Sequence, residues 1–263
     1  MSTVTKTPTR SRFASRNPAL STGSFDKQIA RAGAAGETGM TATGTYLKTA
    51  FLFMLFLGAA FFGWQRVSVV DGIIVDVNLI WLIGSFVSVI ALGVASRFAG
   101  RYIWIVAIAY SLVQGVVTGM MARIFEAQFP GIVLQAALIT LSLYVTAWAL
   151  YTFGVIKVTK GYRTMVMIGT IGVGIFLGIN LLLALFGIQL DLFSQGSWLS
   201  IVVAAVIVLF AVLNLPIDFD FVRQASAAGA PKFMEWQGAF GLIVTIIWLY
   251  MAVLRLLGAT RSR

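Results

Sequence analysis

Seven long apolar runs dominate this sequence and limit what it can fold into. They lie at about 46–64, 77–96, 102–122, 131–154, 165–188, 198–215 and 239–257. Runs of roughly 18 to 24 residues can cross a bilayer as helices, because a helix rises about 1.5 Å per residue and the hydrocarbon core is about 30 Å thick. The connections between them are short, which favours antiparallel neighbours. We therefore expect an all-α membrane protein, a seven-transmembrane-helix bundle.

Composition supports this class and excludes several others. Hydrophobic residues make up 59% of the chain and charged residues only 11%, and there is no Cys and no His. Disulfides, thiolate or imidazole metal sites and Ser-His hydrolase chemistry are therefore excluded, and no nucleophile-base pair is visible. We predict that the protein is not an enzyme.

The net charge of +10 does not point to nucleic acid. The basic residues lie between the apolar runs or near the N-terminus, where membrane topology and anionic lipid account for them. No compact basic and aromatic face supports nucleic-acid binding. The expected partner is the lipid bilayer.

Residues 1–42 are rich in Ser, Thr, Gly and Ala and lack the apolar content to pack a core. We expect a flexible basic cytoplasmic arm, followed by a transmembrane domain at 43–263. Cytoplasmic segments of membrane proteins usually carry an excess of Lys and Arg. With a cytoplasmic N-terminus, most basic residues of this chain lie on the cytoplasmic side, so we expect this orientation. Seven spans then put the basic C-terminus outside, a conflict that a re-entrant last segment would remove.

Two pairs of glycines are spaced for close helix packing. Gly115 and Gly119 lie on one helix face, as do Gly174 and Gly178. Such spacing lets a neighbouring backbone approach closely. We expect packing inside the bundle, with homodimerisation as the alternative.

Polar side chains inside the apolar runs must find partners. Gln114, Gln135 and Asn180 are expected to bond between helices, with a substrate contact as the alternative. Lys48 is expected to reach the cytoplasmic interface along its flexible stem. Arg255 would reach outward to water or inward to a carboxylate.

The strongest candidate site is Asp218 and Asp220, at the end of the sixth run and just after Pro216. Ionisable groups at membrane depth are functional candidates by default. Pro216 predicts a break or a kink in the helix that frees carbonyls near Val212 and Leu213. Carboxylates beside free carbonyls would suit a proton or a hard cation such as Ca²⁺, although both acids could share one ion only on non-helical backbone.

A buried acid here would act as a pH-dependent latch. Its candidate cationic partners are Arg97, Arg101, Lys48 and Arg223. The alternative is a cytoplasmic turn in water, with Asp220 paired to Arg223 at i, i+3.

The chain resembles the Bax-inhibitor family, and in particular its bacterial branch. The resemblance runs from about 17 to 257 and is carried by Lys48-Thr49, by 129–136, and most specifically by Ile217-Asp218-Phe219-Asp220-Phe221 with 230–236 and 248–250. It implies seven helices with the last one central, and a pH-sensitive calcium leak. In characterised relatives, two aspartates on the sixth and seventh helices share a proton, and an arginine from the second helix is their partner.

In this chain the first aspartate maps to Asp218, and the second maps near Ala252, which is not acidic. Gln114 also stands where relatives often carry an acid. Asp220 and Glu235 are the acids that could substitute, and the last run offers Arg255 instead of a carboxylate. Loss of one acid removes the coupling that makes a carboxylate dyad titrate in two steps.

Two functional hypotheses remain open. The first is a bacterial plasma-membrane, multi-pass protein with gated proton or Ca²⁺ permeability, in which Asp218 is the principal acid and no resident cofactor is needed. The second is a non-conducting interaction protein that modulates a membrane-bound AAA protease or another membrane complex, as bacterial relatives do, with the basic arm engaged.

Overall fold

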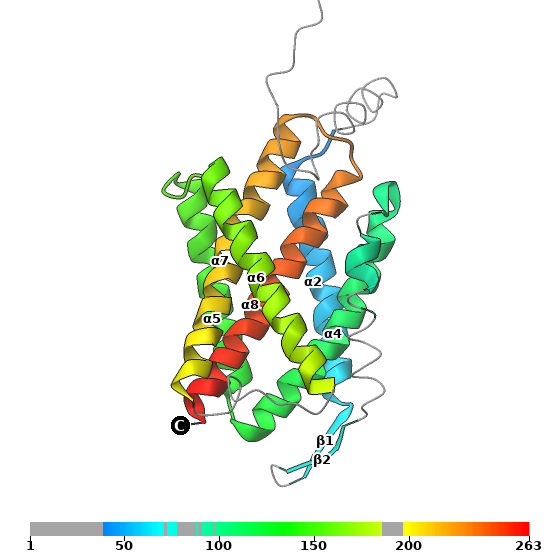
Figure 1. Cartoon of the computed structure of the whole chain (residues 1–263). Helices are drawn as coiled ribbons and strands as arrows, with labels where there is room; N and C mark the ends of the chain where they lie inside the picture. The colour runs from blue at the N-terminus through cyan, green and yellow to red at the C-terminus, as the bar shows by residue number, and fades with distance from the viewer. Residues whose placement is uncertain are drawn as a thin grey trace, which may run out of the picture.

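The computed structural model describes residues 39–70, 73–77, 88, 91–96, 98–185 and 197–262. Its elements are α2 (Ala42–Trp64), β1 (Val67–Val70), β2 (Ile73–Val77), the short 3-10 helix η2 (Gly100–Tyr102), α4 (Ile103–Gln128), α5 (Ile132–Thr152), α6 (Lys160–Leu185), α7 (Trp198–Ala227) and α8 (Met234–Arg261) (Figure 1).

Six of the described helices are long and apolar enough to cross a membrane, which confirms the class of helical membrane protein. They correspond to six of the seven predicted runs. The predicted second span, 77–96, lies largely outside the described residues. Its first residue, Val77, ends β2 rather than starting a helix.

A β-hairpin that the sequence analysis did not anticipate follows α2. Strands β1 and β2 are antiparallel, with Val67 opposite Val77, and their register is irregular between Ser68 and Val69. The hairpin lies at the same end of the bundle as the C-terminus (Figure 1).

Helices α2 and α4 run parallel and in close contact. Gly115 of α4 lies against Phe56 of α2, and Gly119 lies against Ala60. The residue numbers of the two helices therefore increase in the same direction along their contact. A Cβ at either glycine would overlap the α2 backbone, which confirms that this pair serves packing inside the bundle. Gly174 and Gly178 on α6 have no neighbouring atoms within 4 Å of an added Cβ among the described residues. In the part of the chain that the structure describes, no helix packs closely on that second pair.

Helix α8 lies at the centre of the described bundle, in agreement with the expectation that the last helix is central. It packs against α2, α4, α5 and α7 (Figure 1). Ile243 and Ile247 belong to a buried cluster with Leu52 of α2, whereas Leu242 belongs to a second cluster with Phe219 of α7. A helix that is apolar on several faces lies in a protein core or in a membrane, and the buried side chains of α8 place it in the core of this bundle.

Helix α8 also crosses the whole bundle, so the last segment is not re-entrant. Its first turn contacts the start of α2, where Glu235 lies beside Gly44. Its last turn contacts the α4–α5 connection, where Arg261 Nη1 donates to the Pro130 carbonyl at 3.0 Å. At about 1.5 Å per residue, a helix of this length covers a full bilayer core.

Of the break or kink predicted at Pro216, the break is wrong and the kink stays a prediction. Helix α7 continues through this proline to Ala227, 12 residues beyond the predicted end at 215. The neighbouring helix α6 supplies part of the compensation, because Tyr162 donates its phenol hydrogen to the Leu213 carbonyl at 2.8 Å. Proline is tolerated in membrane helices when neighbours satisfy the freed backbone groups in this way.

Candidate functional site

Asp218 lies in the C-terminal half of α7 and points towards α8. Its Oδ2 is 2.5 Å from Oγ1 of Thr245, and its Oδ1 lies near Gly241, one turn earlier on α8. Tyr144 of α5 is a titratable group within electrostatic range of this carboxyl. Asp218 has no ion-pair partner among the described residues.

The two contacts of Thr245 restrict the hydrogen-bonding state of this pair. Thr245 Oγ1 lies 2.5 Å from Asp218 and 3.1 Å from the Gly241 carbonyl, and a carbonyl or an ionised carboxylate can only accept a hydrogen bond. A hydroxyl has only one hydrogen to donate. Both contacts are therefore hydrogen bonds at the same time only when Asp218 carries a proton and donates it to Thr245.

Asp220 points to a different side of α7. Its carboxylate pairs with Arg163 of α6 and accepts from Tyr151 of α5 at 3.1 Å and from Gln224 at 2.7 Å. The predicted pairing with Arg223 is wrong, and Arg223 is exposed. Asp220 therefore ties α5, α6 and α7 together near the end of the bundle.

A cation shared by Asp218 and Asp220 is not supported by this geometry. On a continuous helix, residues two apart face different directions. The two acids accordingly contact different helices, and the Leu213 carbonyl is already occupied by Tyr162. Among the described residues, no three side chains of His, Cys, Asp or Glu lie close enough together to hold a metal ion.

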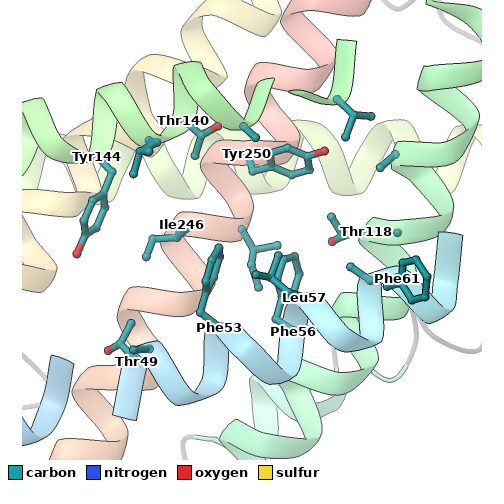
Figure 2. Close-up of a pocket in the computed structure, with 18 of the residues that line it drawn as sticks. Thr49, Phe53, Phe56, Leu57, Phe61, Thr118, Thr140, Tyr144, Ile246 and Tyr250 are labelled. Carbon is teal, nitrogen blue, oxygen red and sulfur yellow. The ribbon is translucent and has the colours of Figure 1, made fainter. Parts of the chain in front are cut away.

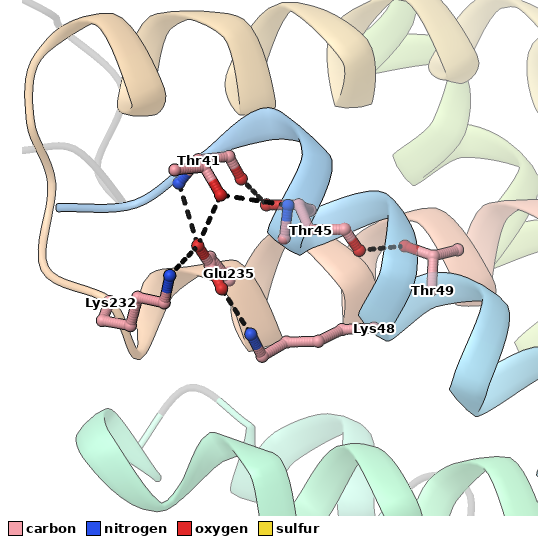
Figure 3. A network of polar contacts seen from close by, with 7 residues as sticks. Thr41, Thr45, Lys48, Thr49, Lys232 and Glu235 are labelled. Atoms are coloured by element: carbon pink, nitrogen blue, oxygen red, sulfur yellow. Dashed lines mark hydrogen bonds and ion pairs between the residues drawn. The ribbon is translucent and has the colours of Figure 1, made fainter. Parts of the chain in front are cut away.

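The second buried carboxylate, Glu235, sits where the chain enters the bundle (Figure 3). It is fully buried and accepts hydrogen bonds from the Thr41 backbone N–H at 2.9 Å and from the Thr41 hydroxyl at 3.0 Å. It also forms ion pairs with Lys48 and with Lys232, the latter at 3.1 Å. Lys48 thus binds Glu235 and does not serve Asp218.

This cluster fixes the start of α2 against the α7–α8 turn. Thr41 also caps α2, since its hydroxyl oxygen accepts from the Gly44 N–H at 3.0 Å. The Met40 N–H donates to the Ala230 carbonyl at 2.6 Å, and Gly39 pairs with Pro231. Residues 39–41, which the sequence analysis assigned to the arm, therefore belong to the folded bundle.

The remaining predicted residues do not converge on Asp218. Arg97 lies outside the described residues, and Arg101 is exposed in η2. Ala252 packs with Val173 and Ile207 and does not oppose Asp218. Thr245 takes that place, so the mapping of the second acid to Ala252 is wrong.

Three predicted interhelical amides behave differently from one another. Asn180 donates to the Phe176 carbonyl of its own helix at 2.7 Å, and Gln114 Oε1 is buried with no partner among the described residues. Gln135 accepts from Arg261 at 2.7 Å and does join two helices. Arg255 lines a cavity of about 390 Å³ with Trp248 and Met251.

Comparison with protein-family models matches residues 17–262 to the family described as Bax inhibitor 1 like. The chain belongs to the Bax inhibitor 1-like family. A search of curated proteins and a search of solved structures each found no match. The family match and the six apolar helices together indicate that this Bax inhibitor 1-like protein is a multi-pass membrane protein.

Sequence reasoning missed two site residues in this family member. Thr245 is a hydroxyl residue inside the apolar run 239–257, which is the signal that could have found it. Arg163 is one of the basic residues that the sequence analysis used only to orient the chain in the membrane. Its pairing with Asp220 depends on how α6 and α7 are rotated, and the local sequence carries no such information.

Proposed function

We propose that this Bax inhibitor 1-like protein is a gated leak for protons and Ca²⁺ in a bacterial plasma membrane, with the Asp218–Thr245 contact as its latch. The observation that carries the proposal is the direct contact of a partly buried acid on α7 with the central helix α8. Ca²⁺ would be a permeant ion here, and Asp220 would have a structural role.

The direction of gating follows from the hydrogen bonds of Thr245. With a proton on Asp218, both contacts of Thr245 are satisfied and α7 is joined to α8. Loss of the proton leaves a charge between two helices that has no cationic partner among the described residues, which is costly unless water reaches it. Separation of α7 from α8 would admit that water, so the leak should open as pH rises.

The test is flux of protons and Ca²⁺ in proteoliposomes between pH 5 and 8. Flux in the unmodified protein should rise with pH. Asp218→Asn should stay at the pH 5 level throughout, because the amide can donate to Thr245 as the protonated acid does. Thr245→Val should raise flux at pH 5. Ser111→Ala removes another buried hydroxyl, bonded within α4, and should leave the profile unchanged.

Two outcomes would reject the latch. One is a pH profile in Asp218→Asn that equals that of the unmodified protein. The other is absence of flux at every pH, which would favour the second candidate function.

The second candidate is a non-conducting protein that modulates a membrane-bound AAA protease or another membrane complex. It is favoured by the Glu235 cluster, which holds the base of the arm at a fixed place beside the α7–α8 turn (Figure 3). Because residues 39–41 belong to the bundle, the informative deletion removes only residues 1–38. Loss of protease co-purification with unchanged stability would support this function, and retained co-purification would count against it.

A further inference from the structure

A large apolar cavity lies between α2, α4, α5 and α8 (Figure 2). Its volume is about 950 Å³, and aromatic side chains such as Phe53, Phe56, Tyr144 and Tyr250 line it. Ligand pockets in proteins have volumes of about 300 to 1,000 Å³ and similar linings of apolar and aromatic groups with few polar ones. The cavity therefore has the size and composition of a ligand site.

The cavity is open sideways, towards the bilayer. Helix α2 packs on α4 and α8, and α5 packs on α7 and α8, so the cavity occupies the space between α2 and α5. Leu57 and Leu141, which line it from these two helices, are 45% and 58% exposed. No charged side chain lines it among the described residues. This arrangement admits neutral, lipid-soluble molecules and disfavours ions and charged headgroups.

One lining hydroxyl lacks a hydrogen-bond partner. Thr118 is 3% exposed, and its Oγ1 contacts no donor or acceptor among the described residues. In contrast, the lining residues Thr49 and Thr140 donate to carbonyls of their own helices, at 2.9 and 2.7 Å. A buried hydroxyl without a partner is unfavourable, and rotation of the Thr118 side chain would turn this hydroxyl, which itself has almost no accessible surface, towards a ligand acceptor in the cavity.

We propose that this cavity binds a neutral lipid-soluble molecule whose apolar body carries a carbonyl, the chemistry of an isoprenoid quinone. The ring would lie among the aromatic side chains, and the carbonyl would accept from Thr118. Tyr250 extends into the same space and offers a second hydroxyl (Figure 2). The ligand would enter between α2 and α5 from the bilayer. This proposal is independent of the latch at Asp218.

The experiment measures saturable quenching of tryptophan fluorescence by decylubiquinone in detergent micelles. Trp64 and Trp148 line the cavity, so a bound quinone ring would lie close to both. Decylbenzene, which has no carbonyl, is the comparison probe, and its binding is measured by displacement. Ala137→Phe fills the cavity from an exposed position on α5, and Ala50→Phe does so from α2. Ala205→Phe, at an exposed site on α7 outside the cavity, is the matched control.

We expect saturable binding that Ala137→Phe and Ala50→Phe abolish and Ala205→Phe leaves intact. Thr118→Val should weaken decylubiquinone binding by about fivefold, the effect of one hydrogen bond, and should not change decylbenzene binding. Equal binding of decylubiquinone to Thr118→Val and the unmodified protein would overturn carbonyl recognition and leave a site for hydrocarbon chains alone. Unchanged binding in both cavity-filling variants would overturn the site itself.

Discussion

Replacement of Glu235 by glutamine tests how the start of α2 is held to the bundle. The Glu235 side chain is fully buried, whereas those of Lys48 and Lys232 are 22% and 48% exposed. Glutamine keeps one oxygen that can accept from Thr41, but it removes the negative charge. Its amide group also places a donor opposite the Lys48 ammonium.

The magnitude follows from these exposures. Removal of one member of a fully buried pair costs about 3 to 5 kcal/mol. Lys48 is partly exposed and can carry its ammonium to water along its stem, so we expect Glu235→Gln to lower the free energy of unfolding by about 2 kcal/mol. Lys232→Met should cost less than about 1 kcal/mol, because an exposed pair contributes little.

Equilibrium unfolding in mixed detergent micelles measures these differences. A double-mutant cycle with Lys48→Met should give a coupling energy of about 1 to 2 kcal/mol, since the two residues are in direct contact. The reasoning is refuted if Glu235→Gln changes the free energy of unfolding by less than about 0.5 kcal/mol. It is also refuted if Lys232→Met costs as much as Lys48→Met.

Two further predictions use matched pairs of glycines, each followed by the same unfolding measurement. Gly44→Ala places a Cβ 2.5 Å from Glu235 Oε1 and should destabilise the protein. Gly58→Ala, on the same helix, meets no described atom within 4 Å and should stabilise the protein by up to about 1 kcal/mol through helix propensity. Equal effects of the two substitutions would contradict the Glu235 contact. Gly119→Ala would overlap the α2 backbone and should cost about 1 to 3 kcal/mol through overpacking, whereas Gly174→Ala on the open face of α6 should be neutral or stabilising. A neutral Gly119→Ala would show that α2 and α4 are not in close contact.

The sequence by itself determined the class of protein and the positions of most helices. Hydrophobicity along a run is a local property, and a run long enough to cross a bilayer has few alternatives to a helix. The described helices therefore overlap six predicted runs, closely for α5 at Ile132–Thr152 against 131–154, although α7 extends 12 residues beyond its predicted end. The family could also be recognised from short motifs, since these are local as well.

The partners of the polar side chains were decided only by the tertiary structure. Pro216 was expected to break or kink its helix, but α7 continues through it, and this continuity turns Asp218 towards α8 and Asp220 towards α5 and α6. Glu235 meets Lys48 although 187 positions separate them in the sequence. Such contacts depend on the rotation and depth of each helix relative to its neighbours, which packing sets and the pattern of one run cannot encode.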